Sequence, residues 1–393
     1  MICVHVSIIW LNCQIVKLLI ESLQLRAQPF TLKPMKIALV HDDLVQWGGA
    51  EKVLSAISDM YPDAPIYTSV YDSNNQLLEN RFKGKRIITS YLQKIPGWKS
   101  LYRMMLPLYP MAFESFDLSE YDLVISQTTK FAKSIVTKPE TTHLCIIHTP
   151  PRFLWHFPSD KTGWWIQPFL SWLRIYDQIS ARRVDHFIAG SYNCQERVRK
   201  IYQVESFVLQ PFVDQTLSTL AKPFKGEYYL LIARLNQYKN ADLVVKAFNE
   251  NGKALKIVGC GPESDRLKRL AKANISFYEK VSDPALASFL AGCKGLIVAA
   301  EEDFGMTALE AQSFGKGVIA YAKGGSRETV IPGKTGIYFK ELKTESLLQA
   351  VEMFETIEID SEACIKQAQA FSLAKFEAKL KNIVERMSNT TSV

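Results

Sequence analysis

The sequence predicts an α/β protein made of two doubly wound domains, each built on a parallel sheet, and three observations support this prediction. The chain has 393 residues, which suits two domains of about 150 to 200 residues better than one core. It is 47% hydrophobic and 22% charged, as is typical of a globular chain. From Met35 onward, short apolar runs alternate with helical segments in two successive series, and this alternation is the pattern of βαβ units.

The first 34 residues differ from this pattern. They are apolar, but His5, Asn12, Gln14 and Lys17 interrupt them, so no uninterrupted span of about 20 apolar residues exists. The charged n-region and the small-residue cleavage site of a signal peptide are also missing. We expect residues 1–34 to be an extension that is either poorly ordered or not native.

The apolar runs are rich in β-branched residues, which predicts strands buried on both faces. The first series consists of "KIALV" (36–40), "PIYTS" (65–69), "DLVIS" (122–126), "HLCIIH" (143–148), "HFIAG" (186–190) and "FVLQ" (207–210). The second consists of "YYLLIA" (228–233), "LKIVG" (255–259), "ISFY" (275–278), "GLIVAA" (295–300), "GVIAYA" (317–322) and "GIYF" (336–339). A linker is predicted at 211–227, where the periodicity lapses.

Composition narrows the range of functions. The seven cysteines are scattered without a CxxC pair or a cluster with histidines, so neither a disulfide framework nor a zinc site is predicted, and a reducing cytoplasm fits best. Basic charge concentrates in residues 81–110, where aromatic residues are interleaved and no acid occurs. Such a stretch can bind nucleic acid or an anionic membrane. A solvated basic face with aromatic residues in the core explains it equally well.

In open parallel sheets, ligands bind beyond the carboxyl ends of the strands, so motifs directly after strands deserve most weight. Gly48 and Gly49 follow the first strand and precede a helix that starts near Ala50; such glycines let backbone amides approach an anion, although a plain turn is as good an explanation. His148 ends a strand and Arg152 follows it. The histidine can donate to a hydroxyl or a phosphate, and the arginine can bind phosphate.

The second half carries a pair of cations and a glycine turn. Arg234 and Lys239 lie just beyond a strand, five residues apart, and both can reach one diphosphate, whose departure as a leaving group needs that neutralisation. Surface salt bridges are the alternative. Gly259 and Gly261 in "GCGP" follow the next strand and would let a sugar or a nucleotide lie against bare backbone, unless they form an ordinary tight turn.

The segment "EEDFGMTALE" (301–310) crowds carboxylates at a strand end. Glu302 is predicted on a loop and Glu310 on a helix that begins near Met306 or Thr307, so both can converge on one ligand. Gly305 leaves the amides of the helix start open to a phosphate. The pattern suits a ligand with hydroxyls at both ends and phosphates between them, with Glu302 accepting from a sugar and Glu310 from a ribose. A hydrolase with paired carboxylates is the competing interpretation.

These motifs together resemble the family 4 glycosyltransferases, which have the two-domain GT-B fold, and most closely the subgroup of O-antigen mannosyltransferases. The resemblance runs from Met35 nearly to the C-terminus and rests on "GGAEKVL", "HTPPRFLW", "RRVDHFIAGSYN", "ARLNQYKN", "GCGP" and "EEDFGMTALE". The pairing of Arg-x4-Lys with Glu-x7-Glu is the specific part of the pattern. The chain departs from it at Gly190, where the family usually has Asn before the serine.

The resemblance implies a role for each matching residue. It implies that Arg234 and Lys239 bind the donor diphosphate, that Glu302 contacts the donor sugar and that His148 lies beside the sugar and the acceptor. Glu310 would hold the ribose. The remaining donor-binding positions that it implies are Gly48, Gly49, Gly259, Gly261, Lys280, Val281, Phe304, Gly305, Met306 and Thr307, with Lys280 and Val281 near the base.

The resemblance also implies a domain plan and an activity. Residues 35–214 would form the acceptor-binding domain, 215–370 the donor-binding domain and 371–393 a helix that packs back on the first domain. We expect a retaining hexosyltransferase without a metal or a cofactor, which moves mannose from GDP-mannose to a lipid-linked or polysaccharide acceptor in surface-glycan synthesis. It would work in the cytoplasm or peripherally on the inner face of the cytoplasmic membrane, without nucleic acid.

Two alternatives stay open at this point: a sugar-nucleotide epimerase of the same fold and a basic nucleic-acid-binding protein. The sequence also leaves open the base, the sugar, the acceptor, the linkage and the oligomeric state, because single pocket side chains decide such choices.

Overall fold

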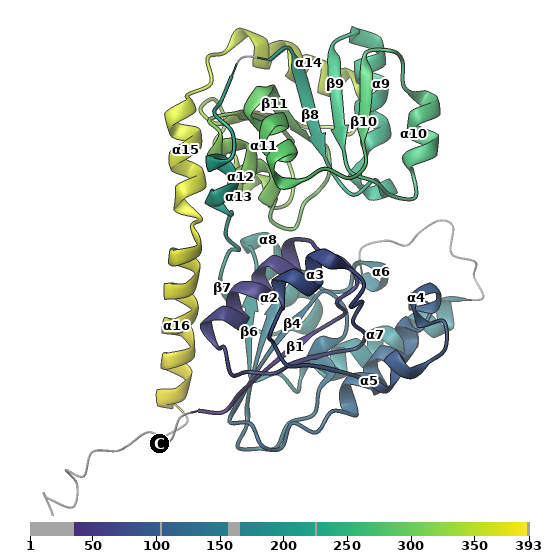
Figure 1. The fold of residues 1–393 in the computed structure, drawn as a ribbon, viewed down its shortest axis with the longest axis vertical. Helices are drawn as coiled ribbons and strands as arrows, with labels where there is room; N and C mark the ends of the chain where they lie inside the picture. Colours follow the sequence, from purple (N-terminus) through teal and green to yellow (C-terminus); the bar gives the residue numbers. More distant parts are fainter. Residues whose placement is uncertain (1–34, 103, 156–165, 225, 391–393) are drawn as a thin grey trace, which may run out of the picture. The chain divides into compact units, whose positions relative to one another are not determined.

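Two parallel sheets organise the molecule (Figure 1). The structure is a computed structural model that describes residues 35–102, 104–155, 166–224 and 226–390. The predicted extension 1–34 therefore lies outside the described residues. From Ile37 onward the chain forms one compact unit.

The first sheet has seven parallel strands in the order β3-β2-β1-β4-β5-β6-β7. The strands are β1 (Ile37–His41), β2 (Ile66–Thr68), β3 (Ile87–Thr89), β4 (Leu123–Thr128), β5 (Thr142–Ile147), β6 (His186–Ala189) and β7 (Ser206–Val208). Every residue of the central strand β4 is buried. Burial on both faces explains why the central runs are almost continuously apolar.

Helices cover both faces of this sheet (Figure 1). They are α2 (Gly49–Met60), α3 (Gln76–Arg81), α4 (Trp98–Leu101), α5 (Tyr109–Glu114), α6 (Arg152–Trp155), α7 (Gln167–Ala181) and α8 (Tyr192–Tyr202). Leu39 of β1 shares a core with Leu54 of α2, whereas its neighbour Val40 shares the opposite core with Phe113 of α5. Successive strand residues point to opposite faces, so each sheet residue contributes to one of the two cores.

The second sheet has six parallel strands in the order β10-β9-β8-β11-β12-β13. The strands are β8 (Tyr228–Ile232), β9 (Ala254–Val258), β10 (Ile275–Tyr278), β11 (Cys293–Val298), β12 (Gly317–Tyr321) and β13 (Gly336–Phe339). Leu231 of β8 packs with Val244, and Leu230 packs with Leu290 on the other face. The prediction of two doubly wound parallel sheets is confirmed.

The helices of the second half again lie on both faces of their sheet (Figure 1). They are α9 (Ala241–Asn251), α10 (Ser264–Leu270), α11 (Asp283–Gly292), α12 (Met306–Ser313), α13 (Ser326–Thr329), α14 (Thr344–Thr356), α15 (Ser361–Ala370) and α16 (Leu373–Thr390). Short 3-10 helices are η1 (Tyr91–Lys94), η2 (Leu106–Leu108), η3 (Ala132–Ser134), η5 (Gln215–Thr219) and η6 (Gln237–Lys239). Among the helices of the described residues, none is long and apolar enough to cross a membrane.

The basic stretch 81–110 contains a strand that was not predicted, and it decides part of the question about its aromatic residues. It contains β3, which the sequence does not predict because three residues between Arg86 and Ser90 are too short an apolar run. Its aromatic side chains largely face inward: Phe82 and Tyr109 are 2% and 0% exposed, and Trp98 packs partly against the core. The interpretation of core aromatics is therefore correct for Phe82 and Tyr109, and these rings offer no stacking platform to a nucleic acid.

The final helix returns to the first sheet. The amide of Val213 donates to the carbonyl of Phe371 at 2.9 Å, so the two segments that connect the sheets lie side by side. Beyond this point α16 buries Phe376 and Leu380 in the core that also contains Leu54 of α2. The core on this face of the first sheet is thus completed by the last helix of the chain.

Candidate functional site

The acidic segment 301–305, which we call the acid loop, follows β11 and leads into α12 at Met306. Gly305 adopts a φ of +95°, a conformation that side-chain-bearing residues rarely adopt, so a glycine is required where the loop turns into the helix. Two further glycines, Gly324 and Gly325, pack against the backbone of the acid loop. A Cβ on Gly324 would lie 2.3 Å from the Glu302 carbonyl oxygen, and one on Gly325 would lie 2.2 Å from Cα of Phe304.

Glu302 faces the cation that the sequence analysis paired with a diphosphate. Lys239 Nζ donates to both carboxylate oxygens of Glu302, at 2.6 and 2.7 Å. Burial favours the neutral amine, but the Glu302 carboxylate holds the pKa of Lys239 above its ordinary value. Asn240, which follows Lys239, donates to the Ala299 carbonyl at 2.9 Å. This bond ties the lysine segment to the end of β11, so Lys239 and Glu302 are held together by the backbone around them.

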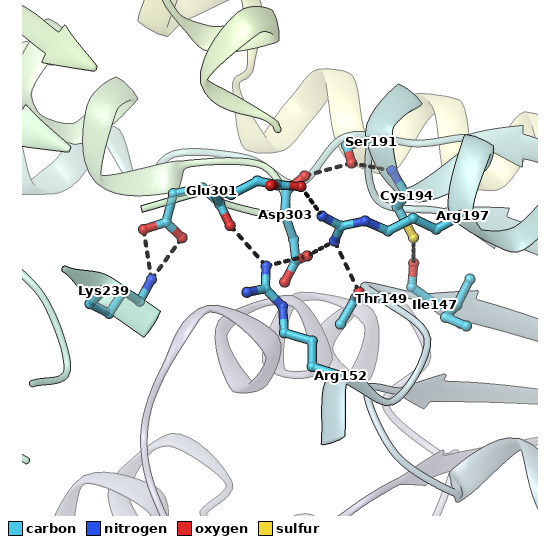
Figure 2. Close-up of polar contacts among 10 residues, drawn as sticks. Ile147, Thr149, Arg152, Ser191, Cys194, Arg197, Lys239, Glu301 and Asp303 are labelled. Carbon is cyan, nitrogen blue, oxygen red and sulfur yellow. Dashed lines mark hydrogen bonds and ion pairs between the residues drawn. The ribbon is translucent and has the colours of Figure 1, made fainter. Parts of the chain in front are cut away.

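Two arginines from the first half of the chain converge on Asp303 (Figure 2). Arg152 Nη2 lies 2.6 Å from Asp303 Oδ1 and 3.0 Å from the Glu301 carbonyl oxygen. Arg197 Nη1 lies 2.5 Å from the same Oδ1, and its Nη2 lies 2.6 Å from Glu301 Oε1. Ser191 Oγ donates to the Asp303 carbonyl at 2.6 Å. The sequence analysis assigned Arg152 to a phosphate, whereas here its partner is a carboxylate.

Glu310 also has a cationic partner from the first half. Lys52 of α2 donates to Glu310 Oε1 at 2.9 Å, and the Glu310 side chain is 7% exposed. The Glu310 carboxylate raises the pKa of Lys52 against the opposing effect of burial. Lys52 therefore bridges α2 to Glu310 of α12, the residue predicted to hold a ribose.

Arg234 differs from the other cations of the site. Its guanidinium donates to the neutral Gln46 Oε1 at 2.6 Å, and within the described part of the chain no carboxylate lies within ion-pair distance of it. The side chain is exposed. Arg234 consequently offers a positive charge that an anion can bind without breaking an existing ion pair.

The glycines of "GCGP" pack against the segment that carries Arg234. A Cβ on Gly259 would lie 2.1 Å from the Ala233 carbonyl oxygen, and one on Gly261 would lie 2.4 Å from that of Leu235. Both positions therefore need glycine for backbone packing, which is a structural reason independent of any ligand. That a ligand also lies against them stays a prediction. Lys280 is exposed beyond β10, and Val281 packs partly against the core.

The other predicted positions surround the start of α12. The Phe304 side chain packs edge-on against Phe371, with ring centroids 5.3 Å apart, so only its backbone can face a ligand. Met306 and Thr307 are partly exposed on the first turn. A Cβ on Gly49 would lie 2.9 Å from Met306 Sδ, and one on Gly48 would lie 3.1 Å from Glu51 Oε2. The start of α2 thus lies directly against the start of α12.

His148 lies at the end of β5, next to this assembly. Its Nε2 is 2.5 Å from the side-chain nitrogen of Gln127, a residue of β4. Burial, with repulsion from His41, lowers the pKa of His148 to about 4, although Asp303, Glu51 and Asp42 oppose the shift. The ring is therefore neutral near pH 7.

Of the predicted residues of the second half, Lys239 and Glu302 are thus in contact, and the structure adds partners that the sequence analysis did not find. Lys52 lies on α2, Arg197 on α8, Gln127 on β4 and Gln46 before α2. Lys52 falls within "GGAEKVL", but no spacing in that motif marks it as a partner of Glu310, and the other three lie outside the quoted motifs. The only signal in the sequence was the excess of acid in residues 301–303, which indicates that cations from elsewhere in the chain must lie beside them. Among the described residues, no group of three or more His, Cys, Asp or Glu side chains is placed to hold a metal ion.

Sequence comparison connects this site with known proteins. Residues 215–371 match the model of the family described as Glycosyl transferases group 1. Over 139 residues the chain is 30% identical to the glycogen synthase of Pseudomonas paraeruginosa, which covers 33% of this chain and 27% of that protein. The chain thus matches about a quarter of the length of that relative.

Structural comparison extends over nearly the whole chain. The sucrose-phosphate synthase from Thermosynechococcus elongatus has a similar fold, with a TM-score of 0.69 and 16% identity over 91% of this chain and 100% of that one. HepE from Anabaena, solved in complex with UDP and glucose, has a TM-score of 0.67 and 19% identity over 89% of this chain and 99% of its own. These likenesses show the fold, and they confirm the GT-B architecture expected from the sequence.

Proposed function

We propose that the protein is a glycosyltransferase that moves a hexose from a nucleoside-diphosphate sugar to a hydroxyl of an acceptor glycan. The observation that carries the proposal is the arrangement at the carboxyl ends of β8 and β11. There, Arg234 has no carboxylate partner among the described residues, and it lies on the same segment as the Lys239–Glu302 pair. The match of residues 215–371 to group 1 glycosyl transferases supports this proposal.

The proposed chemistry follows from charge. When the bond between the sugar and the diphosphate breaks, negative charge grows on the leaving phosphate. Arg234 and Lys239 stabilise that charge, and the amides at the start of α12 add the positive end of a helix dipole. Lys239 has three donors, so it can bond a phosphate oxygen while it still orients Glu302. These groups replace a metal ion, and we propose that transfer retains the anomeric configuration.

The donor is proposed to be held at both ends by carboxylates. Glu302 accepts from the sugar hydroxyls. Glu310 accepts from the ribose and still has Oε2, which no described residue donates to. GDP-mannose is the donor that the sequence resemblance favours, and the complex of HepE with UDP and glucose makes UDP-glucose the first competitor. The acceptor is proposed to be lipid-linked or a polysaccharide.

Nucleotide binding tests the donor site directly. We expect one of GDP, UDP and ADP, at a hundredfold its dissociation constant, to stabilise the protein by about 2.7 kcal/mol in thermal melting. Glu302→Gln should keep this stabilisation but lower transfer at least about 100-fold, because the amide no longer orients Lys239 or accepts as strongly from the sugar. The control is Glu345→Gln on α14, which also removes one carboxylate but lies outside the proposed site, and it should transfer like the wild type. Normal transfer by Glu302→Gln would overturn its proposed role.

The epimerase alternative makes a different prediction in the same assay. An epimerase would convert the sugar nucleotide in the absence of any acceptor, whereas a transferase needs one. Product analysis with and without an acceptor glycan therefore separates the two activities.

A membrane surface is the proposed location of the acceptor. Helix α7 exposes Phe169, Trp172, Ile175 and Ile179, which recur at helical spacing and so form one outward stripe. Met111 of the adjacent α5 is 57% exposed, and α5 and α7 are linked because the Tyr176 hydroxyl of α7 donates to Glu114 Oε1 of α5 at 2.5 Å. An exposed apolar stripe on a helix is typical of surfaces that lie in the interface of a bilayer.

Flotation with vesicles tests this surface. The wild type should float with vesicles that contain anionic phospholipid, and Trp172→Glu combined with Ile175→Glu should leave the protein in the dense fraction. Leu77→Glu on α3 is the matched control, because Leu77 is 59% exposed and its helix lies on the opposite face of the sheet. Equal recovery of the wild type and the double variant would contradict the membrane proposal.

A further inference from the structure

We infer that Gln127 fixes the tautomer of His148 and that Gly190 keeps open the space beside the protonated ring nitrogen. Together they make His148 a neutral hydrogen-bond donor toward the proposed donor sugar. This inference deepens the proposed function and rests on it in one respect, namely that the acceptor of this hydrogen bond belongs to the sugar nucleotide.

The orientation of the Gln127 amide follows from its two neighbours. Gln127 Nε2 lies 2.6 Å from the Ala50 carbonyl oxygen and 2.5 Å from His148 Nε2. A backbone carbonyl can only accept, so the group that faces it must be the NH2 of the amide. The reverse orientation would place two oxygens 2.6 Å apart without a proton between them. The NH2 group therefore also faces His148, and His148 Nε2 must accept.

A neutral imidazole that accepts through Nε2 carries its proton on Nδ1. No described residue accepts a hydrogen bond from His148 Nδ1, and the residue is only partly buried. Nδ1–H is therefore available to a ligand. His148 cannot serve as a base through Nε2 while the amide is bound there, so the role left to it is that of a donor.

Gly190 adjoins this nitrogen. A Cβ on Gly190 would lie 3.4 Å from His148 Nδ1, so a longer side chain here would cover the proton. The next residue, Ser191, donates to the Asp303 carbonyl at 2.6 Å, which places the turn against the acid loop. Nδ1–H therefore lies beside the turn that contacts the acid loop, and we infer that the sugar held by Glu302 lies next to it.

Burial keeps the ring neutral over the working range, because its effect on the pKa outweighs that of the nearby carboxylates. His41, Glu51, Asp42 and Asp303 face it from β1, α2 and the acid loop, and the pKa of His148 is about 4. The wild type should therefore show no titration of His148 between pH 5.5 and pH 8. Gln127→Glu removes the NH2 donor and adds an acceptor, which moves the ring proton to Nε2 and stabilises the imidazolium.

The first test measures the tautomer without an assay of activity. In the full chain labelled with 15N-histidine, long-range 1H–15N spectra distinguish Nδ1–H, Nε2–H and doubly protonated rings, and the spectrum of His148→Gln assigns the signal. We expect Nδ1–H at pH 7 in the wild type, and Nε2–H or a doubly protonated ring in Gln127→Glu. An Nε2–H ring or an imidazolium in the wild type would overturn the inference.

The second test connects the tautomer to transfer. Gln127→Glu should lower kcat at least 10-fold and add an inflection to its pH profile that the wild type lacks, while the Kd for the nucleotide stays within twofold. Gln349→Glu, an exposed change on α14, controls for the added charge. Unchanged kcat in Gln127→Glu would refute the role of the tautomer. A wild type with the Nδ1–H ring and no transfer with any donor would support the tautomer assignment and would instead overturn the proposed function.

Gly190→Ala tests the open space separately. The backbone of Gly190 is outside the glycine-only region and the added Cβ makes contacts of 3.4 Å or longer, so the variant should fold. It should bind the nucleotide normally and raise KM for the sugar nucleotide over that for the wild type by threefold or more. An unchanged KM would show that no ligand approaches Nδ1 from this side.

Discussion

Replacement of Arg234 by alanine is expected to weaken binding of the nucleoside diphosphate by roughly 10- to 100-fold. The expectation follows from two features of the site. Arg234 is bound to the neutral Gln46 amide and not to a carboxylate, so its charge is not already compensated. A hydrogen bond to a charged group contributes about 1.5 to 3 kcal/mol, and about 1.4 kcal/mol corresponds to a factor of ten. Isothermal titration of both proteins with GDP and UDP measures the loss.

A matched control separates this effect from a general loss of positive charge. Arg269 is exposed on α10 of the same half of the chain, and Arg269→Ala should bind the nucleotide like the wild type. Lys239→Ala should act differently, because it leaves Glu302 without its cation and so harms transfer and the sugar end of the site. If Arg234→Ala and Arg269→Ala bind equally well, the diphosphate does not lie at Arg234.

Replacement of Asp177 by alanine should give the largest loss of stability of any single change proposed for this chain. Asp177 and Lys133 form an ion pair in which both side chains are completely buried. The Asp177 carboxylate also accepts from Trp155 Nε1 at 2.7 Å and from the Tyr202 hydroxyl at 2.9 Å. Removal of one partner from a buried pair costs about 3 to 5 kcal/mol, since the other charge remains buried without compensation.

Urea denaturation at pH 7 measures this loss, and a double variant shows its origin. Lys133→Met together with Asp177→Leu removes both charges and should recover part of the stability. The recovery should be incomplete, because the Trp155 and Tyr202 donors remain buried without an acceptor. A loss below about 1 kcal/mol for Asp177→Ala would mean that water reaches Lys133 in the folded protein.

The fold could be predicted from the sequence because a strand that is buried on both faces is a continuous run of apolar residues. In β10 and β13 the predicted runs coincide with the observed strands, Ile275–Tyr278 and Gly336–Phe339. The strand that the sequence does not predict, Ile87–Thr89, is short, and all three of its residues are only partly buried. A short strand of this kind lacks the apolar run on which the prediction depends.

Mainly the residues that the second half of the chain contributes to the site could be predicted from the sequence. Arg234, Lys239, Glu302 and Glu310 share motifs with fixed spacing, so they can be read from the chain. Their partners come from positions far away in the sequence: Lys52 is 258 residues from Glu310. No local pattern records such a distance, because the contact is created by the packing of α2 against α12. The contacts that Lys52, Arg152 and Arg197 make with the acid loop and Glu310 therefore needed the structure.

The place of α16 in the first core has a consequence for how the chain is made. The first sheet is synthesised early, but Phe376 and Leu380, which complete one of its cores, leave the ribosome only after the whole second sheet. Until then, the face of α2 that receives them is exposed to the cell, and domains generally fold as units during synthesis. The newly made first half must therefore be kept from aggregating for the time that the ribosome needs to translate the second.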